Sequence, residues 1–202
     1  EGAEIWLGRP VIVPAVIPCG HCPACQAGRG QICPRQIFPG NDVHGGFASH
    51  VRVPARGLCP VPDLADRARN PHGLALADLS VIADAVSTPY QAVQRSGLGR
   101  GDLAIFVGAG GVGGFGIQIA AALGAAVVAI DVDAGRLDQI CRHGAELGLD
   151  AKALDFKAIK SAVQGFAAER SIPTFRWFIF ETSGSAAGQQ TAYQGHGADS
   201  VP

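Results

Sequence analysis

A glycine-rich turn places the tightest constraint on how this chain can fold. The segment Gly108–Gly113 has the pattern Gly-x-Gly-x-x-Gly, directly follows the apolar run Leu103–Val107, and opens an apolar stretch that reaches about Leu123. A continuous apolar run of this length is expected for a parallel strand covered on both faces. Between such a strand and a helix, the glycines make a tight turn and let the backbone approach a pyrophosphate. The pattern predicts a dinucleotide-binding turn; a tight strand–helix junction without ligand is the alternative.

The chain beyond this turn continues to alternate between strand and helix patterns. Ala126–Ile130 is a second apolar run, and a helix is expected from about Ala134 to His143. Apolar residues then mark one helical face within Ala158–Ala167, and Phe175–Phe180 is the next candidate strand. This order predicts an α/β fold with a doubly wound parallel sheet of the Rossmann type.

The acidic residue Asp131 ends the second of these predicted strands. A carboxylate there accepts hydrogen bonds from the adenosine ribose. It also repels a 2′-phosphate, since two unit charges about 4 Å apart interact by roughly 4 kcal/mol at an effective dielectric near 20. NAD is therefore predicted over NADP. Arg136 either covers the adenine side of the pocket or is a solvated helix residue. The residues predicted to contact the cofactor are Gly108, Gly110, Gly111, Val112, Gly113, Asp131 and Arg136.

Four of the six cysteines lie close together in the chain with the pattern C-x2-C-x2-C-x7-C. Four thiolates can surround one Zn²⁺ tetrahedrally, and a site with four protein ligands is structural because no coordination position stays open. Free or disulfide-bonded cysteines and an iron–sulfur cluster are the alternatives. His21 lies inside the loop and is expected to be an exposed loop residue. The predicted zinc ligands are Cys19, Cys22, Cys25 and Cys33.

The segment before the Rossmann pattern is rich in proline, glycine and valine. Val11–Val13 and Phe47–Val53 are candidate strands, the latter with the alternation of a half-buried strand. Apolar residues recur at helical spacing over Leu76–Ala83, and Thr88 followed by Pro89 predicts the start of another helix. We predict one domain over residues 1–75 and a truncated nucleotide-binding domain over residues 76–202.

Composition excludes several classes of protein. A formal net charge of −1 gives no electrostatic case for nucleic acid or an anionic membrane, and the apolar runs are too short to span a bilayer. No basic-then-apolar leader opens the chain, so a cytoplasmic location is expected. The absence of methionine, and a final stretch Gly197–Pro202 without helix or strand pattern, indicate a fragment.

A Cys₄ lobe followed by a Rossmann unit resembles the zinc-containing medium-chain alcohol dehydrogenases. The resemblance runs from about Val11 to Gly184 and includes Gly45–Ala48 and Ser87–Tyr90. It implies that residues 1–75 are part of a GroES-like catalytic domain. It further implies NAD, one structural and one catalytic zinc in the complete enzyme, a small-molecule alcohol substrate, and a homo-oligomer. This fragment alone is expected to be inactive.

Within that family, several stretches resemble the 6-hydroxycyclohex-1-ene-1-carbonyl-CoA dehydrogenases. They are Pro14–Gly20, Pro39–Asp42, Gly45–Val51, Pro54–Val61 and Ala83–Val93. This resemblance implies oxidation of a ring alcohol on a coenzyme A thioester to the 6-oxo thioester, in anaerobic degradation of benzoyl-CoA. A polyol or simple alcohol dehydrogenase and a non-catalytic NAD-binding protein are the alternatives.

The resemblance departs from the family pattern at the catalytic zinc. The third ligand of that zinc is usually a cysteine four residues before the capping threonine, and here Asp84 holds the position. The other two ligands of the family precede Glu1. Asp84 is therefore a candidate ligand of the catalytic zinc, or an aspartate at the end of a helix that hydrogen-bonds only a metal-bound water or solvent.

Overall fold

The structure, a computed structural model, describes residues 3–195. The chain divides into two compact units between Asp84 and Ala85. Residues 76–84, predicted as the start of the second domain, therefore lie in the first unit. None of the described helices combines the length and apolar character needed to cross a membrane. The segment Gly197–Pro202 lies outside the described residues.

The first unit consists mainly of loops with short regular elements. Strand β1 (Val11–Ile12) pairs antiparallel with β2 (Cys59–Pro60). Ile17 is fully buried and forms an isolated β-bridge with Ile37. The short helices are η1 (Glu4–Trp6), α1 (Pro23–Gln26), η2 (Gly30–Ile32), η3 (Ala55–Gly57) and η4 (Leu76–Ala83).

The strand predicted over Phe47–Val53 is not formed. The segment is irregular, and Phe47 and Val51 are exposed. Alternating apolar residues form a strand only where a neighbouring strand pairs with them and a core covers one face. Within residues 3–195, no strand pairs with this segment. The alternating pattern alone therefore did not produce a strand, because the segment has no neighbouring strand to pair with among the described residues.

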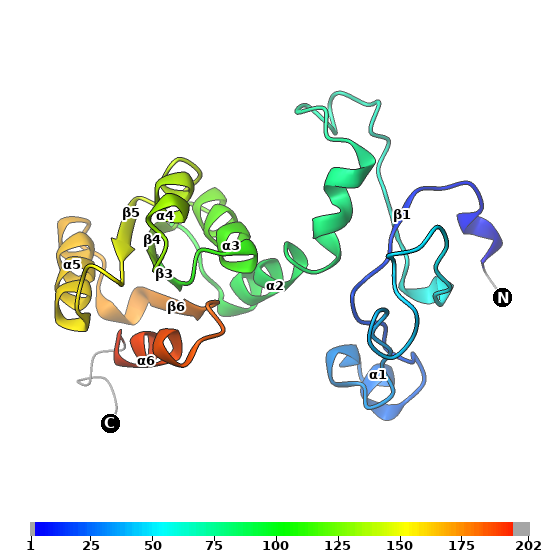
Figure 1. Cartoon of the computed structure of the whole chain (residues 1–202), viewed down its shortest axis with the longest axis horizontal. Helices are drawn as coiled ribbons and strands as arrows, with labels where there is room; N and C mark the ends of the chain where they lie inside the picture. The colour runs from blue at the N-terminus through cyan, green and yellow to red at the C-terminus, as the bar shows by residue number, and fades with distance from the viewer. Residues whose placement is uncertain (1–2, 196–202) are drawn as a thin grey trace. The chain divides into compact units, whose positions relative to one another are not determined.

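The second unit contains a four-stranded parallel sheet in the order β5-β4-β3-β6 (Figure 1). Every residue of the central strand β3 (Leu103–Val107) is buried, as predicted for a strand covered on both faces. It pairs with β4 (Ala126–Asp131) on one side and with β6 (Trp177–Glu181) on the other. Strand β5 (Leu147–Asp150), which the sequence patterns did not reveal, pairs with β4.

Helices cover both faces of this sheet. The side chains of Ala104 and Phe106 pack with α2 (Ser87–Ser96), α3 (Gly111–Ala122) and α4 (Ala134–Cys141). The alternate residues of β3 pack with α5 (Phe156–Glu169) on the opposite face. Helix α6 (Ala186–Gly195) follows β6. The predicted Rossmann architecture is thus confirmed.

The start of helix α2 differs from the sequence prediction. The capping residue is Val86 and the helix begins at Ser87, so Thr88 and Pro89 are its second and third residues. Proline is tolerated throughout the first turn because the N–H groups there have no partner inside the helix. Local sequence thus identified the first turn but not its first residue.

Candidate functional site

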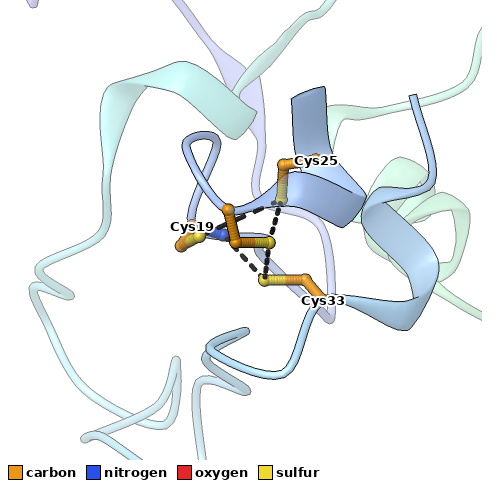
Figure 2. Close-up of side chains that lie close together, drawn as sticks. Cys19, Cys25 and Cys33 are labelled. Carbon is orange, nitrogen blue, oxygen red and sulfur yellow. Dashed lines mark hydrogen bonds between the residues drawn. The ribbon is translucent and has the colours of Figure 1, made fainter. Parts of the chain in front are cut away.

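The first candidate site is a cluster of four cysteine sulfurs in the first unit. Cys22 precedes helix α1, whose first residue, Pro23, suits that position because it lacks an N–H group. The Sγ atom of Cys22 lies 3.4 Å from that of Cys25 and 3.7 Å from that of Cys33, and the Cys19 and Cys25 sulfurs are 4.0 Å apart. Figure 2 shows Cys19, Cys25 and Cys33 pointing toward one another.

These distances fit one zinc ion. Four sulfurs at about 2.3 Å from a tetrahedral zinc lie about 3.8 Å from one another. All four ligand atoms lie within 4.8 Å of one another, and soft thiolate donors favour zinc. The structure contains no disulfide among these cysteines, while Cys59 and Cys141 are exposed and outside the cluster. The chain thus brings together the four residues that the spacing predicted.

Backbone groups donate hydrogen bonds to several of these sulfurs. The N–H groups of Cys19 and Arg35 each donate to the Cys33 sulfur over 3.4 Å. A hydrogen bond from the backbone of His21 lowers the pKa of the Cys19 thiol to about 6. The backbone of Cys25 similarly lowers the pKa of Cys22, whereas burial raises the pKa of the Cys25 thiol to about 11. His21 itself is exposed, as predicted.

The second candidate site is the glycine turn between β3 and α3. Gly108 has φ +101°, a conformation that L side chains rarely adopt, and a Cβ there would lie 2.5 Å from the backbone nitrogen of Ser183. A Cβ on Gly113 would collide with the carbonyl oxygen of Gly108. By contrast, a Cβ on Gly110 or Gly111 would meet no heavy atom within 4 Å, so the space at the helix N-terminus is open. These glycines leave room for a ligand beside the turn.

The carboxylate of Asp131 lies buried beside this turn. Its Oδ2 accepts a 2.6 Å hydrogen bond from the Ala109 N–H, and its Oδ1 accepts one of 2.9 Å from the Asp133 N–H. The Arg136 Nη1 is 3.9 Å from Oδ1, and its Nε is 3.7 Å from Oδ2 of Asp133. The structure therefore brings Asp131 and Arg136 together. Sequence reasoning missed the contact between Asp131 and the turn.

A cavity of about 330 Å³ lies at this edge of the sheet. Residues at or just beyond the carboxyl ends of all four strands of the sheet contribute to its lining. Sequence reasoning missed those that follow β6, although the carboxyl ends of parallel strands meet at one edge of a sheet. The lining includes Gly108, Ile130, Asp131, Arg136, Thr182 and Ser183.

Asp84 follows the last residue of η4 and is exposed. The backbone before it is anchored by a 3.3 Å hydrogen bond from the Ala15 N–H to the Ala83 carbonyl. Within the described part of the chain, the side chains close enough together to hold a metal ion are those of the Cys₄ cluster. Asp84 does not belong to this cluster.

The chain is similar in sequence to known alcohol dehydrogenases. Residues 1–63 match the alcohol dehydrogenase GroES-like domain. An alcohol dehydrogenase of Geobacillus stearothermophilus is 31% identical over 76% of this chain and 43% of its own length. The chain therefore spans less than half of that relative. With the Cys₄ lobe and the Rossmann sheet, these matches show that the chain belongs to the zinc-containing medium-chain alcohol dehydrogenase family.

Solved structures give the same assignment. Galactitol-1-phosphate dehydrogenase from Escherichia coli superposes with a TM-score of 0.78 at 25% identity, over 92% of this chain and 49% of that chain. A zinc-binding dehydrogenase from Sinorhizobium meliloti, bound to NADP, gives 0.75 at 26% identity, over 92% of this chain and 50% of that chain. The combination of a partial GroES-like domain with a Rossmann domain is thus shared with enzymes of this family.

Proposed function

We propose that the full-length protein containing this chain is an NAD-dependent dehydrogenase that oxidises a secondary alcohol. The observation that carries the proposal is the buried Asp131 carboxylate next to a glycine turn with open space at its helix N-terminus. Backbone N–H groups at that N-terminus bind a pyrophosphate, aided by the helix dipole. When bound there, the cofactor would supply the hydride acceptor for oxidation of the alcohol carbon.

The preference for NAD over NADP rests on the charge of Asp131. A 2′-phosphate at the adenosine ribose would come close to this carboxylate and be repelled. Arg136 lies near Oδ1 of Asp131 and also near Oδ2 of Asp133, so its positive charge is shared between two carboxylates. The Sinorhizobium meliloti protein binds NADP, so the preference needs a direct test.

The four clustered cysteines are proposed to hold one structural zinc. Each sulfur would occupy one tetrahedral position, which leaves none for a substrate. A second zinc would supply the Lewis acid that polarises the alcohol and lowers its pKa. We propose that Asp84 is one ligand of that zinc in the complete protein.

Two classes of alcohol are candidate substrates. The sequence resemblance described above supports a cyclic alcohol carried on a coenzyme A thioester, within aromatic compound degradation. The likeness to galactitol-1-phosphate dehydrogenase supports a polyol as the second candidate. Turnover assays of the full-length protein with alcohol thioesters, polyols and simple alcohols would distinguish them. We further propose that the full-length protein is a homo-oligomer located in the cytoplasm.

The cofactor proposal is tested by titrating full-length wild type and Asp131→Asn with NADH and NADPH. We expect wild type to bind NADH more tightly. Removing the charge should raise the affinity for NADPH relative to NADH by about tenfold or more. Equal binding of both dinucleotides by wild type would contradict the charge argument. Binding of neither would contradict the proposed function itself.

A further inference from the structure

The loop after β6 is joined to the glycine turn by one hydroxyl group. The Thr182 Oγ1 donates to the carbonyl oxygen of Gly108 over 2.7 Å and lies 3.2 Å from that of Val107. The Thr182 N–H also donates to the Val107 carbonyl over 2.8 Å. A single threonine, distant in sequence, therefore contacts both the last residue of β3 and the first glycine of the turn.

The turn is also shaped to fit this loop. A Cβ on Gly113 would lie 2.6 Å from the Thr182 Oγ1, and a Cβ on Gly108 would lie 2.7 Å from the Cα of Ser183. Gly108 is thus required by the packing of the turn against the loop after β6, and Gly113 by both the Gly108 carbonyl and the Thr182 hydroxyl. The position of the Thr182 hydroxyl is fixed between the carbonyl of Gly108 and the first turn of α3.

Strand β4 holds the same turn from its other side. The Gly108 N–H donates to the Ile130 carbonyl over 2.8 Å, and the Ala109 N–H donates to Asp131 over 2.6 Å. The first two N–H donors of the turn are therefore bound by β4, and its first carbonyl is bound by Thr182. Asp131 carries charge as well as a hydrogen bond, whereas the neutral Thr182 contributes no charge at the site.

We infer that Thr182 is a positioning residue for the dinucleotide, because its hydroxyl holds the glycine turn in the conformation that receives the pyrophosphate. This inference rests on the proposed function. Without the hydroxyl, the turn populates other conformations, and the apparent affinity falls by the fraction that remains competent. Since no charge changes, NADH and NADPH are affected equally.

The test compares Thr182→Val with Thr182→Ser in the full-length protein by NADH and NADPH titration. Valine has the shape of threonine but lacks the hydroxyl, and serine keeps the hydroxyl. Loss of one hydrogen bond predicts about five- to tenfold weaker binding of both dinucleotides by Thr182→Val, with their ratio unchanged. Thr182→Ser should bind as wild type does.

The matched control is Ser96→Ala. The Ser96 hydroxyl also donates to a backbone carbonyl, that of Val93 over 2.8 Å, but it lies in α2 and outside the turn. This variant should bind NADH as wild type does. Wild-type affinity in Thr182→Val, or an equal loss in Thr182→Ser or in Ser96→Ala, would overturn the inference.

The design separates this inference from the proposed function. If wild type binds neither dinucleotide, the proposed function fails, and the inference fails with it. If wild type binds NADH and Thr182→Val binds it equally well, only the inference fails. Should Thr182→Val not fold, Thr182→Ala compared with Thr182→Ser provides the same contrast, with weaker binding expected for alanine alone.

Discussion

Asp102 and Arg176 form a 2.6 Å ion pair that joins the residue before β3 to the residue before β6. The Asp102 side chain is 9% exposed and the Arg176 side chain 41%. The second Asp102 oxygen accepts from the Gly99 N–H, and Arg176 also donates to the Arg100 carbonyl. This pair lies at the amino ends of the strands, while the dinucleotide cavity lies at their carboxyl ends.

Replacing Arg176 with methionine should destabilise the nucleotide-binding unit. The substitution leaves the buried Asp102 carboxylate without its charged partner, which costs about 1–3 kcal/mol in the free energy of unfolding. Urea unfolding of the variant measures the loss. Glu169→Gln is the control, because Glu169 is 77% exposed and its pair with Arg170 contributes little. Equal stability of Arg176→Met and wild type would contradict the prediction.

Metal analysis should find one zinc in the Cys₄ lobe, and Cys33→Ser should lose it. Cys33 is buried and its sulfur accepts hydrogen bonds from two backbone N–H groups. A serine oxygen cannot replace this sulfur as a zinc ligand. Because metal binding is coupled to folding of such lobes, the variant should also be digested faster by protease. Cys141→Ser serves as the control, since Cys141 lies outside the cluster. Wild type without zinc would refute the assignment.

Zinc binding to the metal-free lobe should release protons and strengthen as pH rises. Between pH values of about 6 and about 11, Cys19 is a thiolate because its pKa is lowered, whereas Cys25 remains a thiol because its pKa is raised. Zinc binds thiolate, so Cys25 must lose its proton in this window. As pH falls through about 6, Cys19 is also protonated, and its contribution is lost. Calorimetry in buffers of different ionisation enthalpy measures the release; binding independent of pH would contradict the argument.

Gly113→Ala should abolish dinucleotide binding and destabilise the second unit. Its Cβ would collide with the Gly108 carbonyl and lie 2.6 Å from the Thr182 hydroxyl, so the turn must move. Gly165→Ala is the matched control, because a Cβ in that exposed position of α5 meets no atom within 4 Å. Helix propensity predicts that this control gains about 0.5–1 kcal/mol in stability. Thermal unfolding and NADH titration test both variants, and normal NADH binding by Gly113→Ala would exclude the packing argument.

Asp84→Asn in the full-length protein should lower both turnover and the content of the second zinc. Asparagine keeps the size of the side chain but loses the charge that a zinc ligand supplies. The Cys₄ zinc should be retained, so metal analysis should show loss of one of two ions. If metal content and turnover both equal those of wild type, Asp84 neither binds the metal nor hydrogen-bonds one of its ligands.

The sequence by itself determined the features that depend on neighbouring residues. The apolar run of β3 can be buried only with both faces covered, and the glycines that follow permit a turn that other residues cannot adopt. The spacing of the four cysteines likewise limits how a short loop can arrange its sulfurs. These features were predicted because the physical constraint and the residues that satisfy it lie in the same segment.

Only the tertiary structure decided the contacts between distant segments. Thr182 reaches Gly108 because β6 pairs with β3, a pairing that no local pattern specifies. Asp131 reaches the Ala109 N–H for the same reason, through the pairing of β4 with β3. Phe47–Val53 has the alternation of a strand but no described partner, and it remains irregular. Hydrogen bonds between strands are made by backbone groups that every sequence carries, so register and partner emerge only when the whole sheet packs.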